Sequence, residues 1–257
     1  MFLTHSLPPR TQAVFQLLAG SALTEGFLLI GGTAMALHIA HRLSNDLDFV
    51  FCEPHGRLPT AKIDGLVLQL RSLGAKVDLV TNSAQESTFR INTGERLSDY
   101  ARDYVVDGVK LTFFAVSPHR SKRFAFWQNA ARSLHSGCAF AVLSLDALKQ
   151  AKTLVLQDRV RSRDLFDLMV LVRDHGYTAR ALFDTVARMA DGAHDGEIER
   201  LILRGLIPLD KQDEGLETVS VATPMPDIYA FFDAQLTEYE AQIHAMHLRA
   251  QRPNAQH

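Results

Sequence analysis

A short apolar run that ends at two consecutive glycines constrains the fold of this chain more than any other feature. The run, Phe27–Ile30, reads as a buried strand because it is continuous and far shorter than a helix. Gly31 and Gly32 follow it, and helical periodicity continues over Thr33–Arg42. Leu47–Phe51 is the next apolar run and predicts a second strand. A strand, a glycine turn, a helix and another strand together predict an α/β layer.

The rest of the first half alternates between the same two periodicities. Apolar residues at helical spacing predict helices over 12–23 and 59–73. Short apolar runs predict strands over 76–80, 88–92, 104–106 and 109–116, with Asp107-Gly108 as a hairpin turn between the last two. Strands joined partly by helices and partly by a hairpin predict an α/β (α+β) fold with a mixed sheet.

From Leu145 onward the pattern is helical almost to the end of the chain. Helices are expected over 145–157, 163–175, 178–189, 197–206 and 226–249, with a loop over 207–224 and a frayed tail over 251–257. We therefore predict two domains, an α/β domain over 1–144 and an all-helical domain over 145–257.

The composition excludes several classes of protein. The 257 residues carry 27 Lys and Arg against 29 Asp and Glu, a net charge of −2, and 47% are hydrophobic, which is typical of globular domains. The two cysteines, Cys52 and Cys138, provide neither a disulfide framework nor a four-cysteine zinc site. Neither a secretory signal nor an apolar stretch of about 18 residues is apparent, so we expect a cytoplasmic protein without a membrane partner.

Two carboxylates follow the glycine turn. Asp46 and Asp48 are two residues apart at the start of the second predicted strand, so their side chains emerge on one face and can share Mg²⁺, with Mn²⁺ as the alternative. Gly31-Gly32 lets the backbone approach a phosphate, and the helix that opens at Thr33 adds its positive N-terminal end. Glycines and carboxylates in this combination suit nucleotidyl transfer. Taken separately, the glycines could form an ordinary strand-to-helix turn, Asp46 could be a helix cap and Asp48 a surface residue.

These motifs resemble those of a known family. GGTAMAL at 31–37 and HRLSNDLDF at 41–49 are similar to the AbiEii/AbiGii toxin family of the DNA polymerase β-like nucleotidyltransferases. Lys152, followed eleven residues later by Arg163-Asp164-Leu-Phe-Asp167-Leu, resembles the second conserved block of that family. The resemblance implies a nucleotidyltransferase fold, completed by a helical domain.

The resemblance also implies roles for individual residues. Gly31 and Gly32 would bind the phosphates of a nucleoside triphosphate (NTP), and Ser44 would form a hydrogen bond with a phosphate oxygen. Asp46 and Asp48 would hold the catalytic metals. Lys152 would neutralise charge on the triphosphate. The expected catalytic set is Asp46, Asp48, Lys152, Asp164 and Asp167, and the nucleotide-binding set is Gly31, Gly32, Thr33, Arg42, Ser44 and Lys152. Arg42 and Arg163 could instead pair with carboxylates.

The third carboxylate that many polymerase β-like enzymes carry on a later strand is missing. Its expected position is Thr112, which is poorly suited to bind a metal or accept a proton. Asp78, on the strand predicted over 76–80, is one substitute. Otherwise the base comes from Asp164 or Asp167, or proton removal is left to water.

A basic stretch bears on the acceptor. Residues 119–163 carry nine Lys and Arg against two Asp, with Phe124, Phe126 and Trp127 among them, which suits an RNA acceptor as well as it suits a solvated face with buried aromatics. The resemblance implies an enzyme of the EC 2.7.7 type, the toxin of a toxin–antitoxin or phage-defence pair, with tRNA as acceptor and an antitoxin as partner. The alternatives are a nucleotidyltransferase that acts on a small molecule such as an antibiotic and a non-catalytic nucleotide-binding module.

Overall fold

The computed structural model describes residues 3–52, 56–116, 121–134, 137–189 and 196–250. The chain divides into two compact units, residues 1–148 and 149–257. The division lies inside the helix α6, Leu145–Val155, whereas the sequence places the boundary after residue 144.

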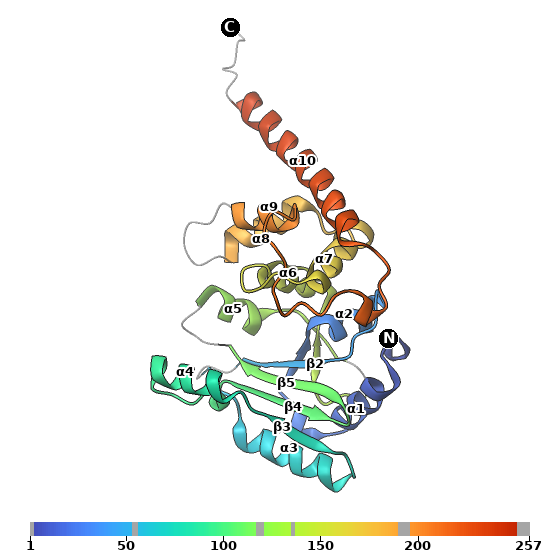
Figure 1. Ribbon diagram of the computed structural model, residues 1–257, viewed down its shortest axis with the longest axis vertical. Coiled ribbons are helices and arrows are strands. Elements are labelled where there is room, and N and C mark those ends of the chain that lie inside the picture. The colour runs from blue at the N-terminus through green and yellow to red at the C-terminus, as the bar shows by residue number, and fades with distance from the viewer. Residues whose placement is uncertain (1–2, 53–55, 117–120, 135–136, 190–195, 251–257) are drawn as a thin grey trace. The chain divides into compact units, whose positions relative to one another are not determined.

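Unit 1 contains a mixed seven-stranded sheet, as the sequence predicts (Figure 1). The strand order is β3-β4-β5-β2-β1-β7-β6. The pairs β2·β5 and β1·β7 are parallel, and the other neighbours are antiparallel. The strands are β1 (Leu28–Ile30), β2 (Leu47–Phe51), β3 (Val77–Val80), β4 (Ala101–Val106), β5 (Val109–Ala115), β6 (Arg132–Ser133) and β7 (Ala141–Leu143).

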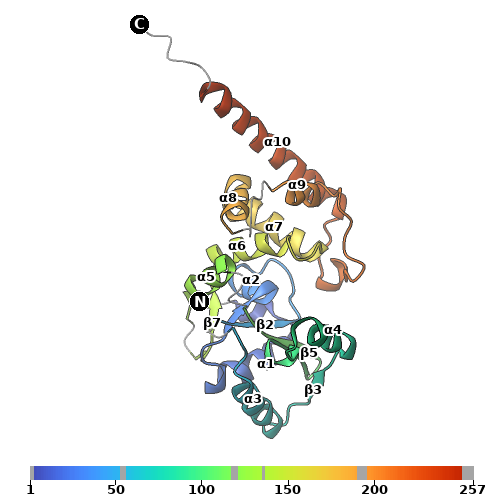
Figure 2. The ribbon, with the colours of Figure 1, turned by 90° about the vertical axis from the view of Figure 1, so that its left-hand side faces the viewer.

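Helices lie on both sides of this sheet. Figures 1 and 2 show α1 and α3 on one side and α2 on the other. The helices of unit 1 are α1 (Pro9–Ala19), α2 (Gly31–Ile39), α3 (Thr60–Ser72), α4 (Ser83–Thr93) and α5 (Ser121–Asn129), with short 3₁₀ turns at Thr4–Ser6, Ala22–Thr24 and Leu97–Asp99.

Aromatic rings form the centre of the core of unit 1. The Phe49 ring, fully buried on β2, lies 5.6 Å from the Phe113 ring of β5 and 5.0 Å from the Phe140 ring, measured between centroids. Phe15 of α1 packs edge-on against Phe140 at 5.4 Å, and Phe27 packs against Phe113 at 5.0 Å. Because side chains alternate along a strand, the burial of Phe49 turns its neighbour Asp48 to the opposite face of the sheet.

Two local predictions have opposite outcomes. The hairpin at Asp107-Gly108 is confirmed: both residues have positive φ, 48° and 84°, and Val106 pairs with Val109, the geometry of a two-residue primed turn. The strand predicted over 88–92 is wrong, because these residues belong to α4. The Asn82 side chain caps that helix by accepting a hydrogen bond from the Gln85 N–H at 3.1 Å, and Gly94 ends it in the left-handed conformation.

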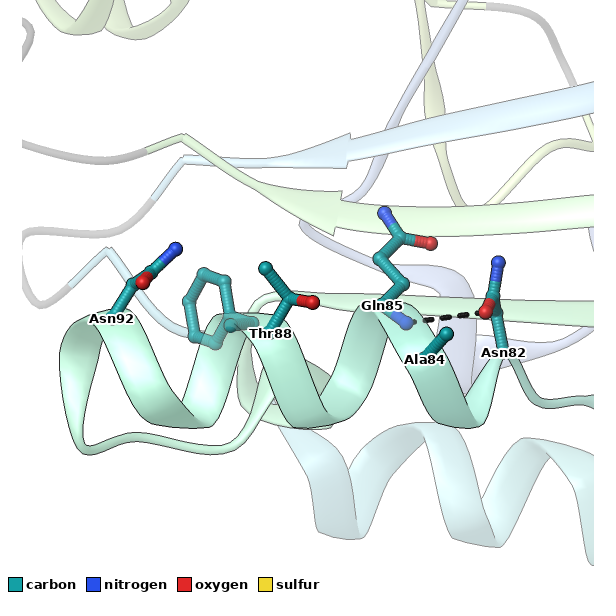
Figure 3. Close-up of a pocket in the computed structure, with 6 residues that line it drawn as sticks. Asn82, Ala84, Gln85, Thr88 and Asn92 are labelled. Carbon is teal, nitrogen blue, oxygen red and sulfur yellow. Dashed lines mark hydrogen bonds between the residues drawn. The ribbon is translucent and has the colours of Figure 1, made fainter.

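A depression of about 430 Å³ runs along α4, and its labelled side chains emerge on one side of the helix (Figure 3). None of the residues predicted to bind nucleotide or metal lines it. Its lining residues are Asn82, Ala84, Gln85, Thr88, Phe89 and Asn92. The sequence also missed three elements of unit 1, namely α5, β6 and β7. Of the two strands among them, β6 has only two residues, too few for periodicity to register.

The regular elements of unit 2 are all helices in the residues that the structure describes, as predicted. Its helices are the C-terminal part of α6, α7 (Ser162–Asp174), α8 (Ala179–Met189), α9 (Glu197–Leu203) and α10 (Met225–Ala250). The N-terminal half of α10 packs against α7, α8 and α9 and buries Ile228, Phe232 and Leu236. The loop predicted over 207–224 contains only a 3₁₀ turn, Glu217–Val219, and the tail predicted over 251–257 lies outside the described residues.

Among the helices that the structure describes, none combines the length and the apolar character needed to cross a membrane.

The aromatic cluster predicts a large effect of one substitution. Phe49→Ala removes a fully buried ring with several ring contacts, so we expect the free energy of unfolding to fall by about 3–5 kcal/mol in urea denaturation followed by circular dichroism. Ile91→Ala is the control: Ile91 on α4 is 82% exposed, and we expect a change within about 0.5 kcal/mol. Equal effects of the two substitutions would contradict this description of the core.

Candidate active site

The N-terminal end of α2 begins at two glycines and presents backbone N–H groups. Gly31, the first residue of the helix, has φ +75°, a conformation that only glycine adopts without strain. No side chain caps the helix at this end. The backbone N–H groups of the first turn have no partner within a helix, so Gly31, Gly32 and Thr33 present donors together with the positive end of the helix dipole.

Asp48 lies directly against the first glycine. β1 and β2 are antiparallel neighbours in which Ile30 pairs with Asp48, so the chain leaves β1 for α2 beside this carboxylate. A Cβ atom on Gly31 would stand 2.9 Å from Asp48 Oδ2, closer than real Cβ atoms approach an oxygen. The missing side chain of Gly31 therefore makes room for the Asp48 carboxylate at the helix end.

Arg42 and Ser44 lie against the second glycine. A Cβ atom on Gly32 would stand 2.6 Å from Arg42 Nη2 and 3.0 Å from Ser44 Oγ. The guanidinium and the hydroxyl thus converge on the backbone at the start of α2. Arg42 Nη1 also donates a hydrogen bond to its neighbour's carbonyl, Leu43 O, at 2.9 Å. A cation, a hydroxyl and backbone N–H donors at one place form a phosphate-binding arrangement.

Thr33 connects the helix to the segment that carries the carboxylates. Its buried hydroxyl donates a hydrogen bond to the carbonyl oxygen of Asp46 and lies 2.8 Å from the hydroxyl of Ser44. These bonds hold the loop between α2 and β2 against the first turn of the helix. All the expected nucleotide-binding residues of unit 1, with Asp46 and Asp48, are therefore brought together.

Asp46 and Asp48 have the chemistry that a divalent cation needs. Asp46 directly precedes β2, Asp48 lies within it, and both side chains are partly exposed. Their carboxylate oxygens are the ligands that Mg²⁺ and Mn²⁺ prefer, and Mg²⁺ completes its coordination with water and substrate phosphates. No cluster of three or more His, Cys, Asp or Glu suited to a metal occurs in the parts of the chain described. A two-carboxylate site beside a phosphate cradle fits this cation.

Unit 2 contains a buried cluster of charged side chains. Lys152, in the last turn of α6, is 4% exposed, and its ammonium lies 2.8 Å from Asp164 Oδ1 and 2.5 Å from Asp167 Oδ2. Asp164 and Asp167 are one turn apart on α7, so both face Lys152. Arg159 Nε adds a bond of 2.8 Å to Asp164 Oδ2. Lys152 is thus part of a buried ion-pair network and not of a solvated helix face.

The network shifts the pKa of Asp164. Burial raises the pKa of this carboxyl, but the positive charges of Lys152 and Arg159 outweigh burial, and the pKa lies below its ordinary value. The sequence prediction missed Arg159, although its place five residues before Asp164 and after the end of α6 is a signal for such a pairing.

The basic stretch over 119–163 is partly occupied with carboxylates. Lys152 and Arg159 belong to the buried network, and Arg163 Nη2 lies 2.6 Å from Glu214 Oε2, as one of the two expectations for this residue has it. His119 and Arg120 lie outside the described residues. In unit 1, Lys122 and Arg132 are exposed, whereas Phe126 of α5 is buried and packs against Trp127 at 4.9 Å. These aromatics therefore belong at least partly to the core.

Asp78 is too far from the carboxylate pair to substitute for a residue at Thr112. Thr112 pairs with Asp48 across β5 and β2, as its expected position requires. Asp78 is on β3, the edge strand three places from β2, and it pairs with Lys76 at 3.3 Å. Strands are about 4.8 Å apart, so three strand spacings separate the two aspartates by roughly 14 Å.

Comparisons with known proteins identify the family of this chain. The family model described as "Nucleotidyl transferase AbiEii toxin, Type IV TA system" matches residues 12–246. The chain therefore belongs to the AbiEii family of nucleotidyltransferase toxins of type IV toxin–antitoxin systems. None of the curated proteins compared with the chain matches it.

Two solved structures are similar to this chain. A candidate nucleotidyltransferase from H. pylori is 14% identical, with a TM-score of 0.50, over 92% of this chain and 96% of the other, which supports the fold. MenT4, a nucleotidyltransferase toxin from Mycobacterium tuberculosis, is 15% identical, with a TM-score of 0.47, over 86% of this chain and 82% of the other.

The contact between Gly31 and Asp48 predicts that Gly31→Ala strongly reduces activity. The new methyl group would displace the Asp48 carboxylate and strain a residue with positive φ. We expect NTP-dependent transfer to fall by about 100-fold or more, measured with radiolabelled NTP. Gly74→Ala is the matched control, because Gly74 has φ +90° and no atom within 4 Å of an added Cβ, so it introduces the strain alone. Equal losses of activity in both variants would contradict the role of this contact.

The lowered pKa of Asp164 predicts a loss of stability in acid. A carboxyl whose pKa is lower in the folded than in the unfolded state contributes stability above about pH 4, and this contribution is lost as the pH falls through the folded-state pKa. We expect the free energy of unfolding to decrease below about pH 4 in urea titrations of the full chain, and less steeply in Asp164→Asn. Asp184→Asn, which changes an exposed carboxyl on α8, should keep the wild-type pH dependence. An unchanged slope in Asp164→Asn would contradict the assignment.

Proposed function

We propose that this protein transfers a nucleoside monophosphate from an NTP to an acceptor hydroxyl, with Mg²⁺ or Mn²⁺, and that tRNA is the acceptor. The observation that carries the proposal is the approach of Asp48, Arg42 and Ser44 to the glycines at the start of α2. It joins a place for phosphate to a place for a divalent cation within one unit. Membership of the nucleotidyltransferase toxin family supports the same chemistry.

In unit 1, each residue has a distinct part in this proposal. The N–H groups of Gly31 and Gly32 bind phosphate oxygens, and Arg42 and Ser44 add a charge and a hydroxyl at the same place. Thr33 positions the loop that carries Ser44 and Asp46. Asp46 and Asp48 hold the metal.

A bound divalent cation would supply electrostatic stabilisation of the charge that develops on the triphosphate. Within unit 2, Asp164 and Asp167 hold the Lys152 ammonium through the contacts at 2.8 and 2.5 Å. In the reaction, the acceptor oxygen bonds to the α-phosphorus, the bond from that phosphorus to the bridging oxygen of the β-phosphate breaks, and pyrophosphate leaves.

The partners follow from the family and the charge distribution. A toxin of a type IV toxin–antitoxin system implies a cognate antitoxin. The exposed Lys122 and Arg132 of unit 1 support an RNA acceptor, because basic side chains neutralise the phosphates of a nucleic acid. The overall charge of −2 restricts this attraction to a local surface.

The proposal is tested with the purified full-length protein, Mg²⁺, total bacterial tRNA and each α-labelled NTP in turn. We expect label to move onto tRNA, and Asp48→Asn to reduce the rate by about two orders of magnitude or more, since the metal loses a ligand. Asp184→Asn, an exposed change on α8, is the control and should transfer at the wild-type rate.

Each outcome decides between the candidate functions. Transfer to tRNA that requires Asp48 supports the proposal. Transfer only to a small-molecule acceptor, such as an aminoglycoside, overturns the tRNA assignment and retains the enzyme class. NTP binding that requires Arg42 but produces no transfer to either acceptor indicates a non-catalytic nucleotide-binding module.

A further inference from the structure

The face of the sheet that carries Asp48 holds a row of polar residues on three adjacent strands. Asp48 of β2 pairs with Thr112 of β5, and Thr112 pairs with Asp103 of β4. Residues paired across strands point to the same face, so the three side chains are neighbours there. The opposite face at this level is the core, where Phe49 and Phe113 are fully buried.

Asp103, on β4, has a carboxylate that makes no structural contact of its own in the described part of the chain. It is partly exposed, and within the described part of the chain no hydrogen bond or ion pair involves its side chain. Its strand neighbours differ: Arg102, on the core face, bonds to Asp64 of α3 at 2.6 Å, and Tyr104 is buried. A carboxylate on the inner strand of a sheet, with nothing paired to it, is available to a bound molecule.

Thr112 gives an independent indication that a molecule binds over this row. Its hydroxyl oxygen is buried and has no hydrogen-bond partner among the residues described. A buried hydroxyl without a partner is costly, and a ligand atom that bonds to it removes the cost. Asp48 and Asp103 stand on either side of Thr112, one strand spacing away each, so their Cα atoms are roughly 9.5 Å apart. Both carboxylates can reach a group bound over Thr112.

We propose that Asp103 is the general base of the reaction and accepts the proton of the acceptor hydroxyl as that oxygen attacks the α-phosphorus. The inference rests on the nucleotidyl transfer proposed above. The O–H bond breaks, its electron pair forms the new O–P bond, the proton moves to a carboxylate oxygen of Asp103, and pyrophosphate takes the electrons of the broken P–O bond. Thr112 occupies the position of the missing third carboxylate and forms a hydrogen bond with the substrate. Asp103, on the adjacent strand β4, provides the carboxylate instead.

The geometry favours a base over a third metal ligand. No three acidic, His or Cys side chains come close enough together to share a metal within the described segments. Asp103 lies two strands from Asp48, on the same face of the sheet. An acceptor hydroxyl over Thr112 lies between the two groups.

The test is steady-state kinetics of Asp103→Asn on the full chain, with the acceptor that the wild-type protein uses. General-base catalysis contributes about 10²–10⁴-fold, so we expect kcat to fall by that factor while the KM for NTP stays within about twofold of wild type. Asp103→Glu, which restores a carboxylate on a longer side chain, should recover part of the lost kcat.

The controls distinguish catalysis from charge and from folding. Asp78→Asn removes a carboxylate from the same face at the edge strand, and we expect wild-type kcat. Thr112→Val keeps the shape and removes the hydroxyl, and we expect a higher KM for the acceptor. Unchanged kcat in Asp103→Asn, with active wild-type protein and inactive Asp48→Asn, overturns this inference alone. If Asp103→Asn raises the KM for NTP and leaves kcat unchanged, Asp103 binds NTP and is not the base, and the inference is overturned. An inactive wild-type protein refutes the proposed function first.

Discussion

The close packing of polar side chains against the backbone of Gly31 and Gly32 is the constraint on which the site of unit 1 depends. Positive φ at Gly31 lets the chain turn from β1 into α2 within one residue, and the missing Cβ leaves room for Asp48. The same absence at Gly32 admits Arg42 and Ser44. The Asp48 carboxylate and the Arg42 guanidinium thus approach one helix end, where a Cβ atom on either glycine would meet one of them.

Unit 2 meets a different physical requirement. The Lys152 ammonium and the carboxylates of Asp164 and Asp167 are almost completely buried. The cost of removing these charges from water is offset because Lys152 contacts both carboxylates and Arg159 adds a further positive charge. Removing one partner would leave a buried charge uncompensated, so the network specifies how α6 and α7 pack. The same contacts fix the orientation of the Lys152 ammonium within unit 2.

The accuracy of the sequence predictions follows the length and periodicity of each element. β2, the hairpin at Asp107-Gly108 and the helices α6–α10 were predicted because each repeats a strong local signal. The strand expected over 88–92 is part of α4, a helix without a fully buried residue, whose ends are set by the Asn82 cap and by Gly94. β6 was missed because a strand of two residues is too short to show a period of its own.

The sequence alone determined the candidate residues. Glycines after a strand and paired aspartates on the next strand are local patterns, and Lys152, Asp164 and Asp167 were recognised by their resemblance to the second block of the family. The tertiary structure decided which groups stand together. Strand order separates Asp78 from Asp48 and places Asp103 two strands away, across Thr112. Strand pairing joins residues that are distant in sequence, through backbone hydrogen bonds that any residue but proline makes, so side-chain identity does not encode the order directly. For that reason the proximity of Asp103 to Asp48 becomes apparent only from the strand register.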